Sequence, residues 1–245
     1  GEVGTGKTLL LRKLMGELAQ EHQVAYLPNP YLEADELRQA LALELGVPAD
    51  GGALAVTDAI HRRLVDLKRE GRSAVLLLDE AQSLPDASLE AIRLFGNLET
   101  ESSKLLQVVL FGQPELDERL QSDHLRQLRQ RITFAYRLRP LVRDETRAYL
   151  EYRLVTSGYR GPVLFAPMAV RLLWRASRGI PRLINILAHK SLMVAYGRGD
   201  GLIRAHHVRA AIRDTEDALL PMSRWWWAAL LLVALASAWL LRGAL

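Results

Sequence analysis

The chain has 245 residues, of which 49% are hydrophobic, enough to bury one sizeable core and a small second domain. The absence of cysteine excludes disulfide bonds and thiolate metal sites. The net charge of +4 comes from 32 basic and 28 acidic residues, and it is too small to indicate a nucleic-acid-binding protein by itself.

The chain starts on GEVGTGKT, which matches the pattern G-x-x-x-x-G-K-[ST] of a phosphate-binding loop. Glycines let the backbone wrap closely, so that its N–H groups point at the phosphates. Lys7 is expected to reach the β- and γ-phosphates of ATP, and the Thr8 hydroxyl to bind Mg²⁺. A glycine-rich turn ahead of an amphipathic helix is the alternative interpretation. The expected nucleotide contacts here are Gly1, Glu2, Val3, Gly4, Thr5, Gly6, Lys7, Thr8 and Leu9.

Residues 9–18 have a helical rhythm, and the positive N-terminal end of this helix would face the same phosphates. A phosphate-binding loop normally follows a strand. We therefore expect a strand before Gly1 and interpret the sequence as a fragment of a longer protein. A short strand at 24–27 and helices at 34–45 and 54–70 are expected next.

Residues 74–78 are five consecutive apolar residues, which predict a parallel strand buried on both faces. Two acids follow at its carboxyl end. Asp79 is expected to hold Mg²⁺ through its water shell, and Glu80 to act as the general base on the attacking water. The alternative is a pair of acids that cap the next helix. The acids lie roughly 70 residues after the phosphate-binding loop in an alternation of strands and helices, as an α/β nucleotide-binding fold requires.

A helix at 86–98 and a second buried strand at 105–111 are expected to follow. Gln113 comes directly after that strand, where a polar side chain would lie beside the γ-phosphate. We therefore identify Gln113 as a candidate sensor of the bound nucleotide. Alternatively, Gln113 only begins a turn ahead of Pro114.

Eight arginines lie between residues 119 and 147, and residues 132–138 are expected to form the last strand of the sheet. Arg129 and Arg131 precede that strand, where a ring-shaped ATPase would place an arginine that reaches into the neighbouring subunit's site. A solvated basic face and a nucleic-acid-binding groove are the two other interpretations.

Helices are predicted at 143–157, 166–177, 181–196 and 205–216, and they would form a small helical lid on the α/β core. Pro181 stands in the first turn of the third of these helices. This placement is expected to aim Arg182 back toward the phosphates. An arginine that is merely exposed at a helix start is the alternative.

Residues 225–241 contain no charged residue, and they include six leucines and four tryptophans. A helix of this length spans about 26 Å, close to the ~30 Å of a membrane's hydrocarbon core. Its tryptophans lie near both ends, where indole rings favour the membrane interface. We expect a single membrane span with the basic lid side in the cytoplasm. A helix docked on the core is the alternative.

Five segments in this order resemble the AAA+ ATPases of the general secretion pathway protein A (ExeA-like) family: GEVGTGKT, LLLDEAQ, VLFGQPEL, LRQRI and SRGIPRLIN. The resemblance covers residues 1–217. It implies a Walker A motif at 1–8 and a Walker B motif at 76–80. It further implies sensor 1 near Gln113, an arginine finger at Arg131 or Arg129, and sensor 2 at Arg182.

The resemblance also implies a parallel AAA+ sheet with strand order 5-1-4-3-2, whose first strand this sequence lacks. Without that central strand we expect the fragment to be unstable on its own. The expected domains are a nucleotide-binding core at 1–140, a lid at 141–220, a transmembrane helix at 225–241 and the start of a periplasmic part at 242–245.

The resemblance implies that the span lies in the bacterial inner membrane and leads to a peptidoglycan-binding domain. In this family the ATPase drives assembly of the outer-membrane secretin in type II secretion. We expect the ATPase to form a homo-oligomeric ring. Other envelope proteins would then be its partners. A pilus-biogenesis or cell-division ATPase with another wall-binding tail stays open. So does a DNA-binding regulator of the transposition-helper or initiator type, although such a soluble regulator needs no membrane span.

Overall fold

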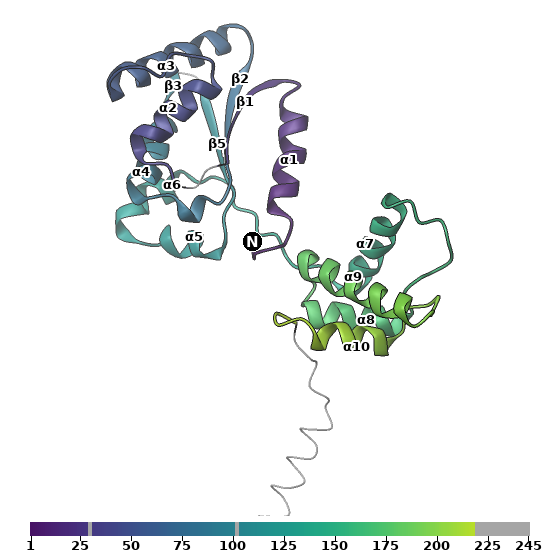
Figure 1. Cartoon of the computed structure of the whole chain (residues 1–245). Helices are drawn as coiled ribbons and strands as arrows, with labels where there is room; N and C mark the ends of the chain where they lie inside the picture. Colours follow the sequence, from purple (N-terminus) through teal and green to yellow (C-terminus); the bar gives the residue numbers. More distant parts are fainter. Residues whose placement is uncertain (29–30, 101–102, 219–245) are drawn as a thin grey trace, which may run out of the picture. The chain divides into compact units, whose positions relative to one another are not determined.

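The computed structural model describes residues 1–28, 31–100 and 103–218. The chain divides into two compact units, Gly1–Arg139 and Pro140–Leu245. The first contains a parallel three-stranded sheet in the order β1-β2-β5, formed by β1 (His22–Leu27), β2 (Ser73–Leu78) and β5 (Leu106–Leu110). Figure 1 shows α1 on one face of this sheet, with α2, α3 and α4 on the other.

The central strand β2 pairs with both neighbours, so that Leu76 lies opposite Ala25 in β1 and Val108 in β5. Its residues from Ala74 to Leu78 are all buried, because helices cover both faces of the sheet. This explains why the strand is a continuous apolar run rather than an alternating one. The carboxyl end of β2 is thereby fixed in the middle of the unit.

Six helices and several shorter elements surround these strands in the first unit. The helices are α1 (Lys7–Leu18), α2 (Ala34–Glu44), α3 (Ala53–Arg69), α4 (Asp86–Phe95), α5 (Pro114–Arg119) and α6 (Arg126–Arg131). The shorter elements are two 3₁₀ turns and a two-stranded antiparallel ladder: η1 (Ala81–Ser83), η2 (Asp123–Leu125), β3 (Glu99–Thr100) and β4 (Ser103–Lys104). Leu37, Leu41, Ile60 and Leu64 contribute fully buried side chains to the core between α2, α3 and the sheet.

The prediction of a last strand at 132–138 is wrong for this structure. The segment has no strand pairing, and Phe134 and Tyr136 are 92% and 85% exposed. A strand forms only beside a neighbour with which it exchanges hydrogen bonds. Within the described ranges, residues 132–138 have no such neighbour. The described strands cover three of the five predicted positions, and the full order stays a prediction.

The second unit is helical in its described part. It consists of α7 (Arg143–Thr156), α8 (Pro167–Ser177), α9 (Pro181–Gly197) and α10 (Ala205–Arg213). A short parallel bridge joins Phe165 to Ile203. The core of this unit is apolar and includes Leu173 and Leu187, both fully buried.

The expected membrane span at 225–241 and the expected periplasmic start at 242–245 lie outside the described residues. Of the helices that the structure does describe, none combines the length and the apolar character needed to cross a bilayer.

Candidate nucleotide-binding site

The loop before α1 has a backbone conformation that requires glycine. Gly4 and Gly6 have φ angles of 79° and 98°, in the left-handed region that other residues seldom adopt. Gly6 is also the N-cap residue of α1. The loop is closed by Thr5, whose hydroxyl donates to the carbonyl oxygen of Glu2 at 2.8 Å. Glycines at these two positions therefore shape the loop.

The N-terminus of α1 is suited to bind an anion. No side chain caps it, and its first turn carries no acidic residue, so its backbone N–H groups stay available to an anion. Lys7 begins the helix and is only 7% exposed. Its Nζ donates to the carbonyl oxygens of Gly1 at 2.8 Å and of Glu2 at 3.0 Å, which place the ammonium group inside the loop. The N-terminus of α1 and the ammonium group of Lys7 thus place positive charge at the same point.

The two predicted magnesium ligands are in contact. Thr8 Oγ1 donates a hydrogen bond to Asp79 Oδ2 at 3.0 Å, although 71 residues separate them in the chain. Asp79 follows β2 and is only 6% exposed, and its Oδ1 accepts a hydrogen bond from the Glu80 N–H at 2.9 Å. A hydroxyl and a carboxylate are oxygen ligands of the kind that Mg²⁺ prefers. The residues present therefore fit a Mg²⁺ ion at this point.

Glu80 has a backbone conformation that is rare for its type, with φ at 51°. Such outliers often mark functional positions. Its Oε2 accepts hydrogen bonds from Gln113 Nε2 at 2.9 Å and from Gln82 Nε2 at 2.7 Å. The Gln113 bond is the main cause that lowers the pKa of the Glu80 carboxyl below its ordinary value. The Gln82 bond and the charge of Lys7 also lower this pKa, while burial opposes them. Glu80 is therefore held as a carboxylate.

Sequence reasoning missed Gln82. This residue lies in η1, and its Oε1 accepts a hydrogen bond from the Gln113 N–H at 3.0 Å while its Nε2 donates to Glu80. Gln82 thus joins the turn after β2 to the turn after β5. The only signal available was its position, two residues beyond Glu80 at the end of a buried strand.

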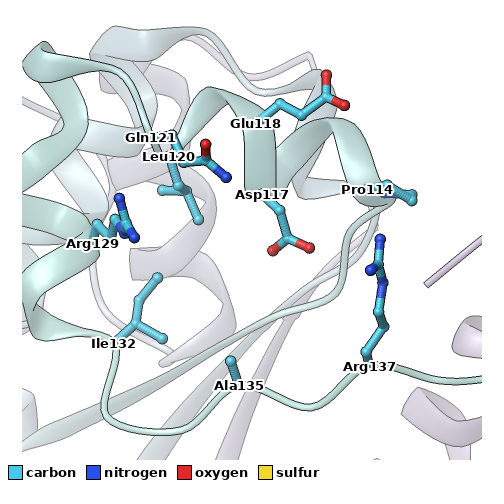
Figure 2. A pocket seen from close by; sticks show the side chains of 9 residues that line it. All are labelled: Pro114, Asp117, Glu118, Leu120, Gln121, Arg129, Ile132, Ala135 and Arg137. Atoms are coloured by element: carbon cyan, nitrogen blue, oxygen red, sulfur yellow. The ribbon is translucent and has the colours of Figure 1, made fainter.

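The structure does not bring Arg129 or Arg131 to this cluster. Arg129 and Arg131 lie on α6, and within the described part of the chain neither guanidinium forms a hydrogen bond or ion pair. Figure 2 shows that Arg129 lines a pocket beside Leu120, between α5, α6 and residues 132–137, which follow α6. Arg131 is exposed at the last residue of α6 and does not line that pocket. Arg182 belongs to the second unit, at the start of α9.

The chain is similar to a known protein family and to a known secretion protein. Residues 1–120 match the family model described as AAA domain. Over 246 aligned residues the chain is 41% identical to general secretion pathway protein A of Aeromonas hydrophila. The resemblance to general secretion pathway protein A that was inferred from the motifs is therefore confirmed. The alignment covers 92% of this chain and 45% of the curated relative's length.

Solved structures agree on the fold. Cdc6p from Pyrobaculum aerophilum has a TM-score of 0.62 at 20% identity and is matched over 87% of this chain. The Aeropyrum pernix ORC2 protein, solved as ADPNP–ADP complexes, has a TM-score of 0.62 at 18% identity over 89%. A RuvB mutant from Thermotoga maritima has a TM-score of 0.57 at 16% identity over 89%. The matches cover 59%, 60% and 62% of the lengths of these three solved chains, in the same order. The predicted α/β fold of the P-loop AAA+ type is thus confirmed.

Proposed function

We propose that this protein is a Mg²⁺-dependent ATPase. The observation that carries the proposal is the 3.0 Å contact between Thr8 and Asp79, because it joins the phosphate-binding loop to the acids at the end of β2. The glycine loop, Lys7 and the first turn of α1 would bind the phosphates of ATP. Thr8 and Asp79 would hold Mg²⁺, which neutralises charge on the phosphate oxygens.

Glu80 is the proposed general base, since it follows Asp79 directly and its carboxylate is held by two amide side chains. It would orient the attacking water and accept its proton. Gln113 is proposed to have two partners, the Glu80 carboxylate that it contacts in this structure and the γ-phosphate of bound ATP. From the second unit, Arg182 is proposed to contact the nucleotide as sensor 2.

The acid limb of the pH–rate profile tests the link between Gln113 and Glu80. Only the ionised carboxyl can accept a proton, so turnover is lost as pH falls through the Glu80 pKa. Gln113 is the main cause that lowers this pKa. Gln113→Ala should therefore raise the pKa and move the acid limb to higher pH, apart from any loss of maximal rate.

Gln20→Ala, which changes an exposed glutamine in the turn after α1, is the matched control and should leave the profile in place. An acid limb at the same pH in Gln113→Ala and in the wild-type protein would show that Gln113 does not tune the base.

The proposed cellular role is to drive assembly of a cell-envelope complex from the inner membrane, with the ATPase domain in the cytoplasm. Its support is the 41% identity to general secretion pathway protein A. The complex that we propose is the type II secretion secretin, with the protein held to peptidoglycan by a further domain. In cells that produce Glu80→Gln instead of the wild-type protein, assembled secretin should fall while its monomer persists. Normal amounts of assembled secretin would contradict this role.

We further propose that the protein acts as a homo-oligomer in which Arg131 reaches the nucleotide of a neighbouring subunit. Arg131 is favoured over Arg129 because Arg129 faces the pocket beside α5 of its own unit (Figure 2). Arg131→Ala should bind ATP normally and hydrolyse it on the order of 10³-fold more slowly. Arg126→Ala, at the other end of α6, serves as the control.

Mixing Arg131→Ala with Lys7→Ala tests whether the arginine acts between subunits. One mixed interface would combine an intact phosphate-binding loop with an intact Arg131, so part of the turnover should return. If no mixing ratio restores turnover, Arg131 does not act in trans.

A further inference from the structure

The chain that enters the second unit is bonded to the loop between α8 and α9. Leu141 is the second residue of that unit, and both of its main-chain polar groups are used there. Its N–H donates to the carbonyl oxygen of Gly179 at 2.8 Å. Its carbonyl oxygen accepts a hydrogen bond from the indole Nε1 of Trp174 at 3.1 Å. We call this set of contacts the Leu141 clamp.

The clamp requires glycine at position 179. A Cβ added there would lie 2.1 Å from the carbonyl oxygen of Leu141, and Gly179 has φ at 75°. Arg178 before it is also left-handed, with φ at 56°. Among the residues that the structure describes, Glu80 is the one other non-glycine residue with positive φ. Such conformations persist only where the surroundings hold them.

Ser177 forms two of the hydrogen bonds that keep the loop in this conformation. It is fully buried, and its hydroxyl donates to the carbonyl oxygen of Trp174 while accepting from the Gly179 N–H, both at 3.2 Å. The Gly179 N–H also donates to the carbonyl oxygen of Trp174 at 3.2 Å. The short loop is thus fixed from both sides, by Ser177 within α8 and by Leu141 across it.

The helix that carries Arg182 begins directly after this loop. The Ile180 N–H donates to the carbonyl oxygen of Ser177 at 3.0 Å, and α9 starts at Pro181. The direction in which Arg182 leaves α9 therefore depends on the same loop that grips Leu141. Arg182 itself is exposed and forms no hydrogen bond or ion pair within the described ranges, so its own contacts do not fix it.

We propose that Trp174 is a positioning residue for Arg182, and that it acts through the Leu141 clamp. The inference rests on the proposed contact of Arg182 with the nucleotide. The indole N–H ties Leu141, near the start of the second unit, to α8, and Leu141 in turn bonds the loop that leads into α9. Loss of the indole N–H should therefore disturb the placement of Arg182 at the start of α9. The physical test of this coupling between Trp174 and Arg182 is a double-mutant cycle.

Trp174→Phe is the sharpest probe, because it keeps an aromatic ring in place and removes the indole N–H. ATP turnover of the full-length protein is measured for Trp174→Phe, Arg182→Ala and the double variant. Trp174→Phe alone should lower turnover about fivefold to tenfold, the effect of one lost hydrogen bond. In the Arg182→Ala background the same change should alter turnover by less than about twofold, since the residue that it positions is gone.

Two further variants keep the test decisive. Gly179→Ala breaks the clamp from the other side and should show the same loss of effect in the Arg182→Ala background. Tyr196→Phe changes an exposed aromatic residue at the end of α9 and should match the wild-type protein in turnover. Thermal melting of each variant separates a loss of fold from a loss of positioning.

Two results would overturn the inference while leaving the proposed ATPase intact. One is wild-type turnover in Trp174→Phe. The other is an equal fold-loss from Trp174→Phe in both backgrounds, which would show an effect on the lid that does not pass through Arg182. Wild-type turnover in Arg182→Ala is a different failure, because it would remove Arg182 from the proposed function itself.

Discussion

Lys7→Ala should abolish ATP binding. The ammonium group is nearly buried within the loop, so alanine removes the one side-chain charge that the loop offers to the phosphates. Charge-assisted hydrogen bonds contribute about 1.5–3 kcal/mol each, and Lys7 is expected to form one to the β- and one to the γ-phosphate. Because each 1.4 kcal/mol is about tenfold in affinity, the dissociation constant should rise at least about a hundredfold. Titration with a fluorescent ATP analogue measures it.

Lys13→Ala is the matched control for this change. Lys13 lies on the same helix, and it is exposed and paired with Glu17 at 3.8 Å. Its removal should leave ATP affinity unchanged and cost little stability, because exposed ion pairs of this kind contribute about 0.3–0.5 kcal/mol. If Lys7→Ala and Lys13→Ala bind ATP equally well, the loop is not a phosphate-binding site.

Glu80→Gln should bind ATP and fail to hydrolyse it at the normal rate. Glutamine keeps the size of the side chain but cannot accept a proton from water. Loss of a general base slows turnover by about 10²–10⁴-fold. Because ATP stays bound, the variant should also accumulate oligomers, which size-exclusion chromatography with ATP detects.

Glu115→Gln changes an exposed acid in the first turn of α5 and should hydrolyse ATP normally. Unchanged turnover in Glu80→Gln would move the role of general base to another residue. Normal turnover in both variants, with ATP binding intact, would leave the phosphate-binding loop in place and remove only this step.

The sequence was most informative where a local pattern determines the structure. The continuous apolar run of β2 indicates a strand that is covered on both faces, so the strand and the position of the acids at its end could be predicted. The conformation of the glycine loop could be predicted as well, because Gly4 and Gly6 are of the residue type that adopts positive φ angles readily. The contact of Thr8 with Asp79 followed once both motifs were placed on one parallel sheet.

Contacts that depend on tertiary packing could not be predicted in the same way. The bonds of Gln82 to Glu80 and to Gln113 join the ends of two strands, and no spacing rule encodes them. The segment 132–138 has the composition of a strand, yet a strand also needs a partner. The choice between Arg129 and Arg131 likewise depends on which side chain faces the pocket at α5.

The Leu141 clamp is a second example of this limit. The sequence around Gly179 predicted a helix start and an arginine, and both are present in the structure. It gave no sign that Leu141, 38 residues earlier by their numbering, would lie against the same glycine. Only the close approach of the two backbones explains why glycine is needed there.

A crystal structure of the protein with Mg²⁺ and a non-hydrolysable ATP analogue tests the central claim most directly. The account predicts that the Thr8 hydroxyl binds the metal, that Asp79 holds it through water, and that Lys7 contacts the β- and γ-phosphates. A nucleotide bound elsewhere, or a metal that touches neither Thr8 nor the water shell of Asp79, would contradict it.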